Sequence, residues 1–219
     1  VSLQHLTAYI LRTQDIKTGL LTSRLAAFVS AMVCGYAMAR PESVIAVMNP
    51  IYVPASRALQ IYAIGVLITI VTTPLAQVVA GTDRSMASKP GRKITRLAIA
   101  SLVTSVIYVS TLSTLLLVLN NWSPVVLWTI SFVVWRSTML AIVLMISDTV
   151  SRRIFLQSTA TRVALYTTIA YILSTTVTLP GYEVRFLDNA ILLIKNFIIV
   201  VALYTLITVS YTHLTLPTN

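Results

Sequence analysis

The chain has 219 residues, of which 57% are hydrophobic and only 10% are charged, with a mean hydropathy of +0.86. Soluble domains carry about 25% charged residues, so this composition excludes a water-soluble globule of this size. The net charge of +10 does not indicate nucleic-acid binding, because the Lys and Arg residues lie in gaps between apolar blocks rather than on one polar face.

Six apolar blocks predict an all-α polytopic membrane bundle with six transmembrane helices. Helices are expected because an open backbone in hydrocarbon leaves its polar groups unpaired. Residues 1–24 are expected to form a cytoplasmic or interfacial leader, and 25–208 the bundle. Most blocks reach the roughly 20 residues that a helix needs to cross a bilayer. The expected spans are about 25–39, 58–80, 97–119, 124–147, 163–182 and 189–208.

The Lys and Arg residues collect in every second gap. Gaps 1–24, 82–96 and 148–162 hold eleven of them, whereas gaps 40–57, 120–123 and 183–188 hold three. Cytoplasmic gaps of membrane proteins are enriched in Lys and Arg, so the N-terminus and the basic gaps are predicted to be cytoplasmic. The expected location is a cell membrane, with the lipid bilayer as a partner and anionic headgroups as the counter-charge.

The last residues are interpreted as non-native. Val209–Thr218 (VSYTHLTLPT) resembles the translated read-through of a sequencing adapter. We therefore expect 209–219 to be a non-native tail that carries no information on the fold. Because the chain begins with Val1 and the natural frame is expected to continue beyond Thr208, the sequence is expected to be a fragment.

Small residues recur along the first span at Ala27, Ala31, Gly35 and Ala39. A spacing of four residues places them on one helical face, where another backbone can approach closely. We expect this face to be a helix-packing contact.

Two cations fall within spans. Arg136 lies at the middle of the fourth span, where a charge costs about 2.5–3.5 kcal/mol on insertion scales. Arg136 is therefore a candidate for the substrate or coupling path, although bonds to backbone carbonyls or hydroxyls would also accommodate it. Lys195 is roughly 9 Å inside the outer end of the last span at the helical rise. It either extends to the headgroups or shares a central cavity with Asn196.

Hydroxyl side chains are frequent in the third and fifth spans, where they could line a polar path or bond between helices. The acidic residues all lie in gaps or at span ends, and Cys34 is the one cysteine. No Ser–His pair, HExxH motif, phosphate-binding Gly loop or Cys pair occurs in the sequence. We therefore expect no enzyme activity, no metal and no cofactor.

The gap between spans two and three suggests a family. It contains Gly81, Asp83 and Arg84, and then Gly91, Arg92 and Lys93. This pattern resembles the loop signature of the major facilitator superfamily, although residues 85–90 insert between its two parts. An arginine in the fourth span, the stretch Ile146–Thr149 with Arg152 and Arg153, and residues 185–189 are also similar to that family.

The resemblance implies the N-terminal half of a twelve-span secondary transporter that moves a small solute by alternating access. The six loop residues would then hold the two halves together on the cytoplasmic side in one state and release them in the other. The partner would be the missing second half of the same chain.

Two alternatives remain open from the residues. The chain could be the permease subunit of an ABC-type exporter, with a separate ATPase as its partner. It could also be a non-transporting polytopic membrane scaffold. The loop itself could be only a basic turn held by lipid charge, and the solute is not readable from the sequence.

Overall fold

The structure is a computed structural model that describes residues 16–81, 91–177 and 186–215. Every regular element in these ranges is a helix. The long helices are α2 (Ile16–Ala39), α4 (Ser56–Gly81), α5 (Arg92–Val118), α6 (Pro124–Ile146), α8 (Thr161–Val177) and α9 (Phe186–Thr215). The short elements are α3 (Pro41–Met48), the 3₁₀ helix η1 (Pro50–Ala55), α7 (Thr149–Phe155) and the π turn η2 (Leu156–Ala160).

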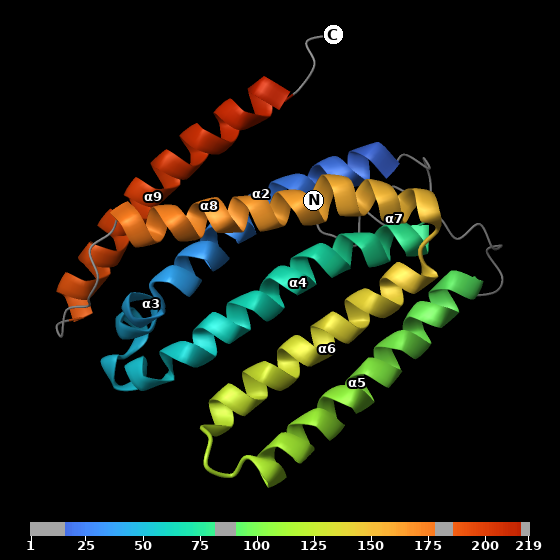
Figure 1. The fold of residues 1–219 in the computed structure, drawn as a ribbon, viewed down its shortest axis with the longest axis horizontal. Coiled ribbons are helices and arrows are strands. Elements are labelled where there is room, and N and C mark those ends of the chain that lie inside the picture. Colours follow the sequence, from blue (N-terminus) through green and yellow to red (C-terminus); the bar gives the residue numbers. More distant parts are fainter. Residues whose placement is uncertain (1–15, 82–90, 178–185, 216–219) are drawn as a thin grey trace.

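The long helices run up and down along one axis (Figure 1). The start of α5 and the junction of α6 with α7 lie at one end, and the turn between α5 and α6 lies at the other. The first of these ends carries Arg92 and Lys93 on α5, with Arg152 and Arg153 on α7. The arrangement is compatible with the expected cytoplasmic side, and the orientation in a membrane stays a prediction.

Four helical stretches in the described ranges are long and apolar enough to cross a membrane. They are Pro50–Gly81, Arg92–Val118, Pro124–Ile146 and Leu187–Thr208. The expected first span lies within α2, whose apolar part Ala27–Ala39 is shorter. Residues 163–177 of the expected fifth span lie in α8, and 178–182 lie outside the described residues. Four spanning helices are therefore supported, and the count of six stays a prediction.

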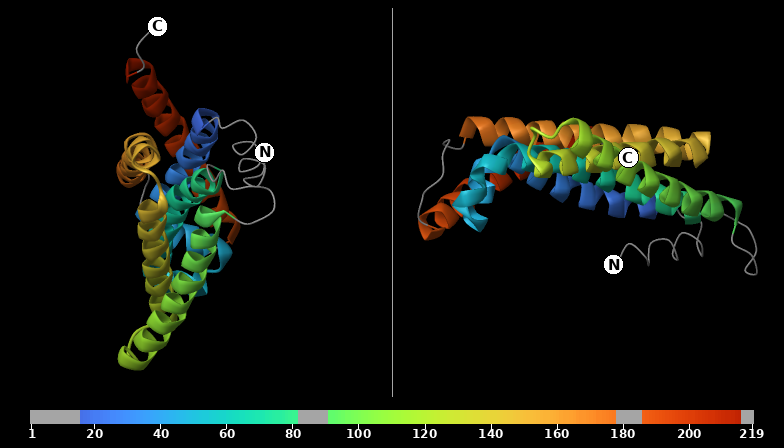
Figure 2. Two further views of the ribbon diagram at one scale, coloured as in Figure 1. Left: turned by 90° about the vertical axis from the view of Figure 1, so that its right-hand side faces the viewer. Right: turned by 90° about the horizontal axis from the view of Figure 1, so that it is seen from below.

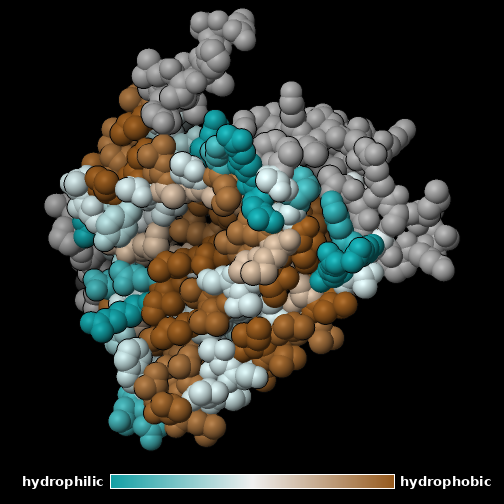
Figure 3. All heavy atoms as spheres, turned by 45° about the vertical axis from the view of Figure 1, so that its right-hand side comes forward, coloured by the Kyte–Doolittle hydropathy of each residue, from teal (hydrophilic) through white to brown (hydrophobic). Residues whose placement is uncertain are grey.

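The helices present apolar side chains outward. On α5, Leu102, Val106, Val109 and Leu117 are exposed, the last to 82%. In Figure 3 hydrophobic residues cover much of one face, and hydrophilic residues gather mainly toward its margins. Monomeric soluble proteins rarely expose large contiguous apolar patches, whereas lipid-facing helices need them. The surface therefore agrees with the composition in indicating a membrane protein.

Two gaps that were expected to be connections contain helical structure. Between α2 and α4, α3 and η1 form a compact corner. Between α6 and α8, α7 passes through the π turn η2 directly into α8. The expected cytoplasmic gap 148–162 is therefore helical from Thr149 onward. At the other end of the chain α9 continues to Thr215, so the first part of the segment interpreted as a non-native tail is also helical.

Two helix crossings dominate the packing, α2 against α8 and α4 against α6. Both views of Figure 2 show the long helices side by side in a bundle that is thinner than it is long. At the first crossing a Cβ added to Gly35 would lie 2.6 Å from the Cβ of Ala170 and 2.9 Å from the carbonyl oxygen of Thr167. At the second, a Cβ added to Gly65 would lie 2.5 Å from the ring of Phe132. Glycine thus permits close approach at both crossings.

Three of the four small residues of α2, Ala27, Ala31 and Gly35, lie in the first of these contacts. Ala27 and Ala31 are 2% and 0% exposed, Gly35 is buried against α8, and Ala39 is half-buried near the end of the helix. Phe28 and Tyr166 complete the packing with an edge-to-face contact at 5.7 Å between ring centroids. Tyr204 of α9 donates a hydrogen bond from its hydroxyl to the carbonyl oxygen of Phe28 at 2.9 Å, which ties α9 to α2.

Most hydroxyl side chains bond within their own helix. Ser105 donates to the carbonyl oxygen of Ser101 at 2.8 Å, and Ser174 donates to that of Ala170 at 2.6 Å. Thr104 is an exception in part, because its hydroxyl also lies 3.8 Å from the sulfur of Met139 on α6. Bonds to carbonyls three or four residues earlier satisfy a hydroxyl without water. They account for Thr104 and Ser105 of α5 and for Thr168, Ser174, Thr175 and Thr176 of α8, whereas the hydroxyl of Thr167 is buried without a partner.

Gly35→Ala is expected to destabilise the bundle by about 1–3 kcal/mol, as overpacking of a close contact does. Helix propensity favours alanine over glycine by about 1 kcal/mol. A net loss of stability can therefore come only from the clash with α8. The measurement is the thermal midpoint of the purified chain in detergent. Val33→Ala, at a position on α2 that is 47% exposed, is the control and should change it little. An equal or higher midpoint for the glycine variant would contradict the close approach.

Candidate functional site

Arg136 lies in the middle of α6 and is half-buried among aromatic rings. Its guanidinium carbon lies 4.0 Å from the ring centroid of Trp135 and 5.1 Å from that of Phe132. Residues four apart share a helical face, so the side chain can lie over Phe132 one turn earlier. A cation over a ring face is attracted by the ring quadrupole, by about 2 kcal/mol when the pair is desolvated. These rings partly offset the cost of the charge in a membrane.

The rings form a group of contacts that extends toward the N-terminal end of α6. Tyr62 of α4 stacks on Phe132 at 5.1 Å and on Trp128 at 5.8 Å between centroids. Gly65 makes this arrangement possible, because any side chain there would displace the Phe132 ring. On the other side, Trp135 contacts Tyr108 of α5 at 5.3 Å. Arg136 thus lies at the inner end of an aromatic stack shared by three helices.

The guanidinium of Arg136 is only partly satisfied. Its Nε is buried and has no hydrogen-bond partner. Within the described ranges, no carboxylate forms an ion pair with it. Most buried polar groups in proteins have partners, and an exception calls for an explanation. Five other buried side-chain atoms of the described residues also lack a partner, so Arg136 is set apart by its place in the middle of an apolar helix.

A groove of about 300 Å³ opens where η1 and the start of α4 meet the start of α6. Its lining is almost entirely apolar and includes Tyr52, Leu59, Tyr62, Val125, Trp128 and Thr129. Tyr62 and Trp128 belong both to this groove and to the aromatic stack. The groove and Arg136 are therefore connected through Phe132.

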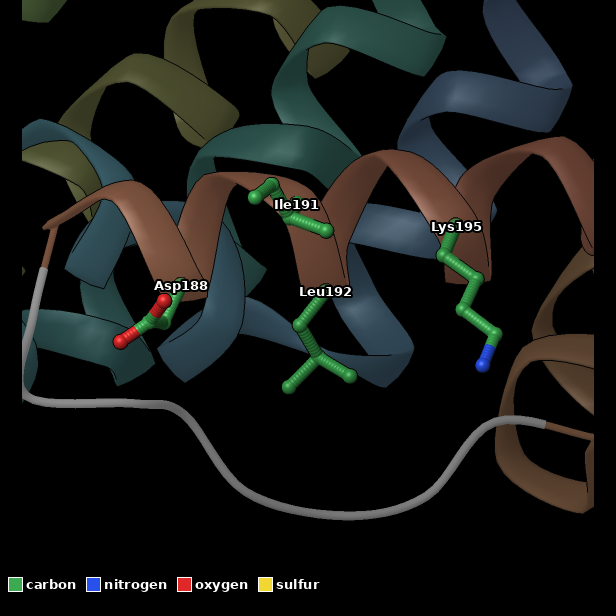
Figure 4. A pocket seen from close by; sticks show the side chains of 4 residues that line it. All are labelled: Asp188, Ile191, Leu192 and Lys195. Atoms are coloured by element: carbon green, nitrogen blue, oxygen red, sulfur yellow. The ribbon is translucent and has the colours of Figure 1, made fainter.

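Lys195 and Asn196 lie apart from Arg136. The helices that carry them, α9 and α6, are separated by α8, α2 and α4 in Figure 1. Lys195 is exposed and borders an open pocket of about 450 Å³ together with Asp188, Ile191 and Leu192 (Figure 4). Asn196 is 8% exposed and faces the helix packing. The three candidates for one path therefore do not form one cluster.

Charged and capping groups join the helices at the basic end. Lys93 of α5 forms an ion pair with Asp148 at 3.8 Å. Asp148 is the N-cap of α7 and accepts a hydrogen bond from the backbone N–H of Ser151 at 3.1 Å. Arg152 donates to the carbonyl oxygen of Ser147 at 3.1 Å, at the C-terminal end of α6, where a cation is favoured. Three helix ends are thus held together.

The pKa of Asp148 reflects this environment. Burial by itself raises the pKa, but hydrogen bonds from the backbone and hydroxyl of Ser151 and the charge of Lys93 outweigh it. The pKa therefore lies below its ordinary value of 3.8. A depressed carboxyl pKa means that the ionised group stabilises the fold above the unfolded value, and that this stabilisation is lost as the pH falls through the folded value.

The loop residues that resemble a family signature are only partly described. Asp83 and Arg84 lie outside the described residues. Gly81 is the last residue of α4, and Gly91 is the extended N-cap of α5. Arg92 is exposed at the start of α5, while Lys93 reaches Asp148.

Three residues that position this architecture were not singled out from the sequence. Arg40 donates from Nε and Nη2 to the carbonyl oxygens of Ser174 and Thr175, at 3.2 and 3.1 Å, and so caps the C-terminal end of α8. Its partners are more than 130 residues away, so no local signal marks it. No local sequence pattern marks Gly65 as a packing residue either. Asp148 could have been found, because an Asp directly before a helical segment is a typical N-cap.

Comparison with known proteins adds no family to this geometry. No family model matches the chain, and no curated protein or solved structure matches it. Among the described residues, no three His, Cys, Asp or Glu side chains gather into a group that could hold a metal ion.

Asp148→Ala is expected to cost about 0.5–2 kcal/mol of stability at neutral pH, as the loss of an N-cap does. Asp148→Asn should cost less, because asparagine also caps a helix and only the charge is lost. The measurement is the thermal midpoint in detergent at neutral pH and below pH 3.8. The advantage of the native chain over the asparagine variant should shrink in acid. A difference that is independent of pH would contradict the role of the carboxylate charge.

Proposed function

We propose that the chain is part of a multi-pass integral membrane transporter that moves a small solute by alternating access. In this proposal it forms the N-terminal six-helix half of a secondary transporter similar to the major facilitator superfamily, in the cell membrane with a cytoplasmic N-terminus. The partner is the second half of the same chain. The four helices that are long and apolar enough to cross a membrane support the membrane assignment.

The observation that carries the proposal is a repeated packing pattern. If the first three long helices are matched with the last three, α2 corresponds to α6, α4 to α8 and α5 to α9. The crossing of α4 with α6 then corresponds to the crossing of α8 with α2, and these are the two dominant crossings. The contacts of α4 with α5 and of α5 with α6 also have counterparts, in α8 with α9 and α9 with α2. The counterparts of the contacts of α5 with α6 and of α2 with α4 are both much weaker.

A repeated three-helix packing pattern is expected of a secondary transporter. Inverted three-helix repeats are nested within each half of many secondary transporters, and cargo binds near the midplane between repeats. Arg136 lies at that depth in α6. The glycine contacts at the two corresponding crossings allow helices to pack closely with little side-chain interlocking.

The basic end fits a role in the conformational cycle. In this proposal, a latch between the two halves on the cytoplasmic side is formed by six loop residues: Gly81, Asp83, Arg84, Gly91, Arg92 and Lys93. The ion pair of Lys93 with Asp148 and the cap on α7 tie that latch to the inner end of α6. A change in the latch would thereby be passed to the helix that carries Arg136.

Accessibility at mid-membrane tests the proposal without knowledge of the cargo. In a full-length background with Cys34→Ala, Arg136→Cys is expected to react with a membrane-impermeant thiol reagent from either side of the membrane. Alternating access exposes the same midplane site to both sides, whereas a scaffold does not. The measurement is labelling in right-side-out and in inside-out vesicles.

Val109→Cys is the matched control, because Val109 is 60% exposed on the outward face of the mid-portion of α5. It should label from neither side. Labelling of Arg136→Cys from one side only, or from neither, would overturn alternating access. Lys195→Cys distinguishes the two interpretations of that lysine, since a side chain that reaches the outer headgroups should react from the outside only.

The uninterrupted reading frame beyond Thr208 provides a second test. Six further apolar spans are expected for a secondary transporter. A stop codon soon after α9 would instead favour the subunit of an ABC-type exporter, and a soluble output domain would favour a scaffold. The measurement is the sequence of the complete gene.

A further inference from the structure

The apolar groove at the start of α6 and the half-buried cation in the middle of α6 are linked through the contacts of Phe132. The groove of about 300 Å³ ends at Tyr62 and Trp128, whose rings stack at an interplanar angle of 16°. Phe132 follows one turn along α6, at 5.1 Å from Tyr62 between centroids. A volume of this order is at the lower end of the range for small-molecule sites.

Arg136 is placed to complete this feature. Side chains on a helix lean toward its N-terminus, and the start of α6 is the end at which the groove opens. The guanidinium carbon lies 5.1 Å from the centroid of Phe132, so a single ring separates the charge from the groove. The cation therefore lies one aromatic ring beyond the apolar groove, toward the middle of α6.

The chemistry of the guanidinium defines what the inner end can hold. The rings of Trp135 and Phe132 contact the guanidinium, which donates its hydrogen bonds within its own plane. The Nε has no partner, and no carboxylate of the described residues neutralises the charge. A planar fork of donors matches a carboxylate, and their interaction strengthens where water is excluded. A cationic ligand is disfavoured there by repulsion.

We propose that the groove, Phe132 and Arg136 form one binding site for an amphipathic aromatic carboxylate. The carboxylate binds the guanidinium of Arg136, and the flat apolar body stacks on Tyr62 and Trp128 in the groove. The site names a substrate class for the transporter, and its role in transport rests on the function proposed above. Binding itself does not depend on that function.

Equilibrium binding to the full chain in a neutral detergent tests the site, with isothermal titration calorimetry as the measurement. The probes are 2-naphthoate and its neutral counterpart 2-naphthamide, which share the ring system and differ in charge. The native chain is expected to bind 2-naphthoate at least tenfold more tightly. Equal dissociation constants for the two probes would overturn the proposal.

Variants separate the charge from the aromatic surface. Arg136→Gln should abolish the preference for the anion, so that the two probes bind with about equal dissociation constants, and should leave 2-naphthamide binding unchanged. Arg136→Lys should retain part of the preference. Unchanged amide binding also shows that the glutamine variant is folded. Arg57→Gln, at an exposed arginine near the groove's end of α4, is the matched control and should keep the full preference. A preference that persists in Arg136→Gln would overturn the assignment of the carboxylate.

Tyr62→Ala should weaken both naphthalene probes by at least fivefold and leave their ratio intact. Octanoate carries the same carboxylate on an aliphatic chain and tests whether the groove instead takes lipid-like acids. Tighter binding of octanoate than of 2-naphthoate, or no effect of Tyr62→Ala, would overturn the aromatic part of the proposal.

The outcome is distinguishable from that of the proposed function. Two-sided labelling of Arg136→Cys without a preference for 2-naphthoate would leave the transporter in place and remove this site. A clear preference with labelling from one side only would establish the site and remove alternating access.

Discussion

The structure depends on satisfying polar groups where water is absent. Apolar side chains cover the outer faces of the long helices, so a polar atom between them must find a partner within the protein. Ser105 and Ser174 donate to carbonyls of their own helices, and Tyr204 donates to the carbonyl of Phe28. Arg40 caps the last turn of α8. Six buried side-chain atoms of the described residues lack such a partner, and the Nε of Arg136 is the one that belongs to a cation in the middle of a long apolar helix.

Close helix contacts set the positions of these groups. Hydrocarbon gives helices no hydrophobic reason to associate, so packing and hydrogen bonds must hold them together. Gly35 brings α2 against α8, and Gly65 brings α4 against the ring of Phe132. The second contact also orients the aromatic stack on which the guanidinium of Arg136 lies. Gly65 therefore both permits the close packing of α4 against α6 and sets the position of the aromatic rings beside Arg136.

The sequence was sufficient for features that depend on local composition. Apolar blocks predicted an all-helical membrane protein, and the place of Arg136 within a block predicted a charge at mid-helix. The aromatic stack, the cap by Arg40 and the role of Gly65 depend on helices that are distant in sequence, so no local pattern revealed them. Local signals were also overlooked, since Asp148 precedes a helix as a typical N-cap and α7 fills a gap expected to be a connection.

The π turn at Leu156–Ala160 has a consequence for the crossing of α2 with α8. A π turn accommodates one additional residue compared with an α-helical turn, and each residue advances a helix by about 100°. The angle between the basic segment of α7 and the face of α8 that carries Ala170 therefore differs from that in an uninterrupted α-helix. In a regular helix without that extra residue, Ala170 would be turned away from Gly35 although the composition of the span would hardly change. The one additional residue of the π turn thus sets the angle between the charged helix α7 and the packed helix α8.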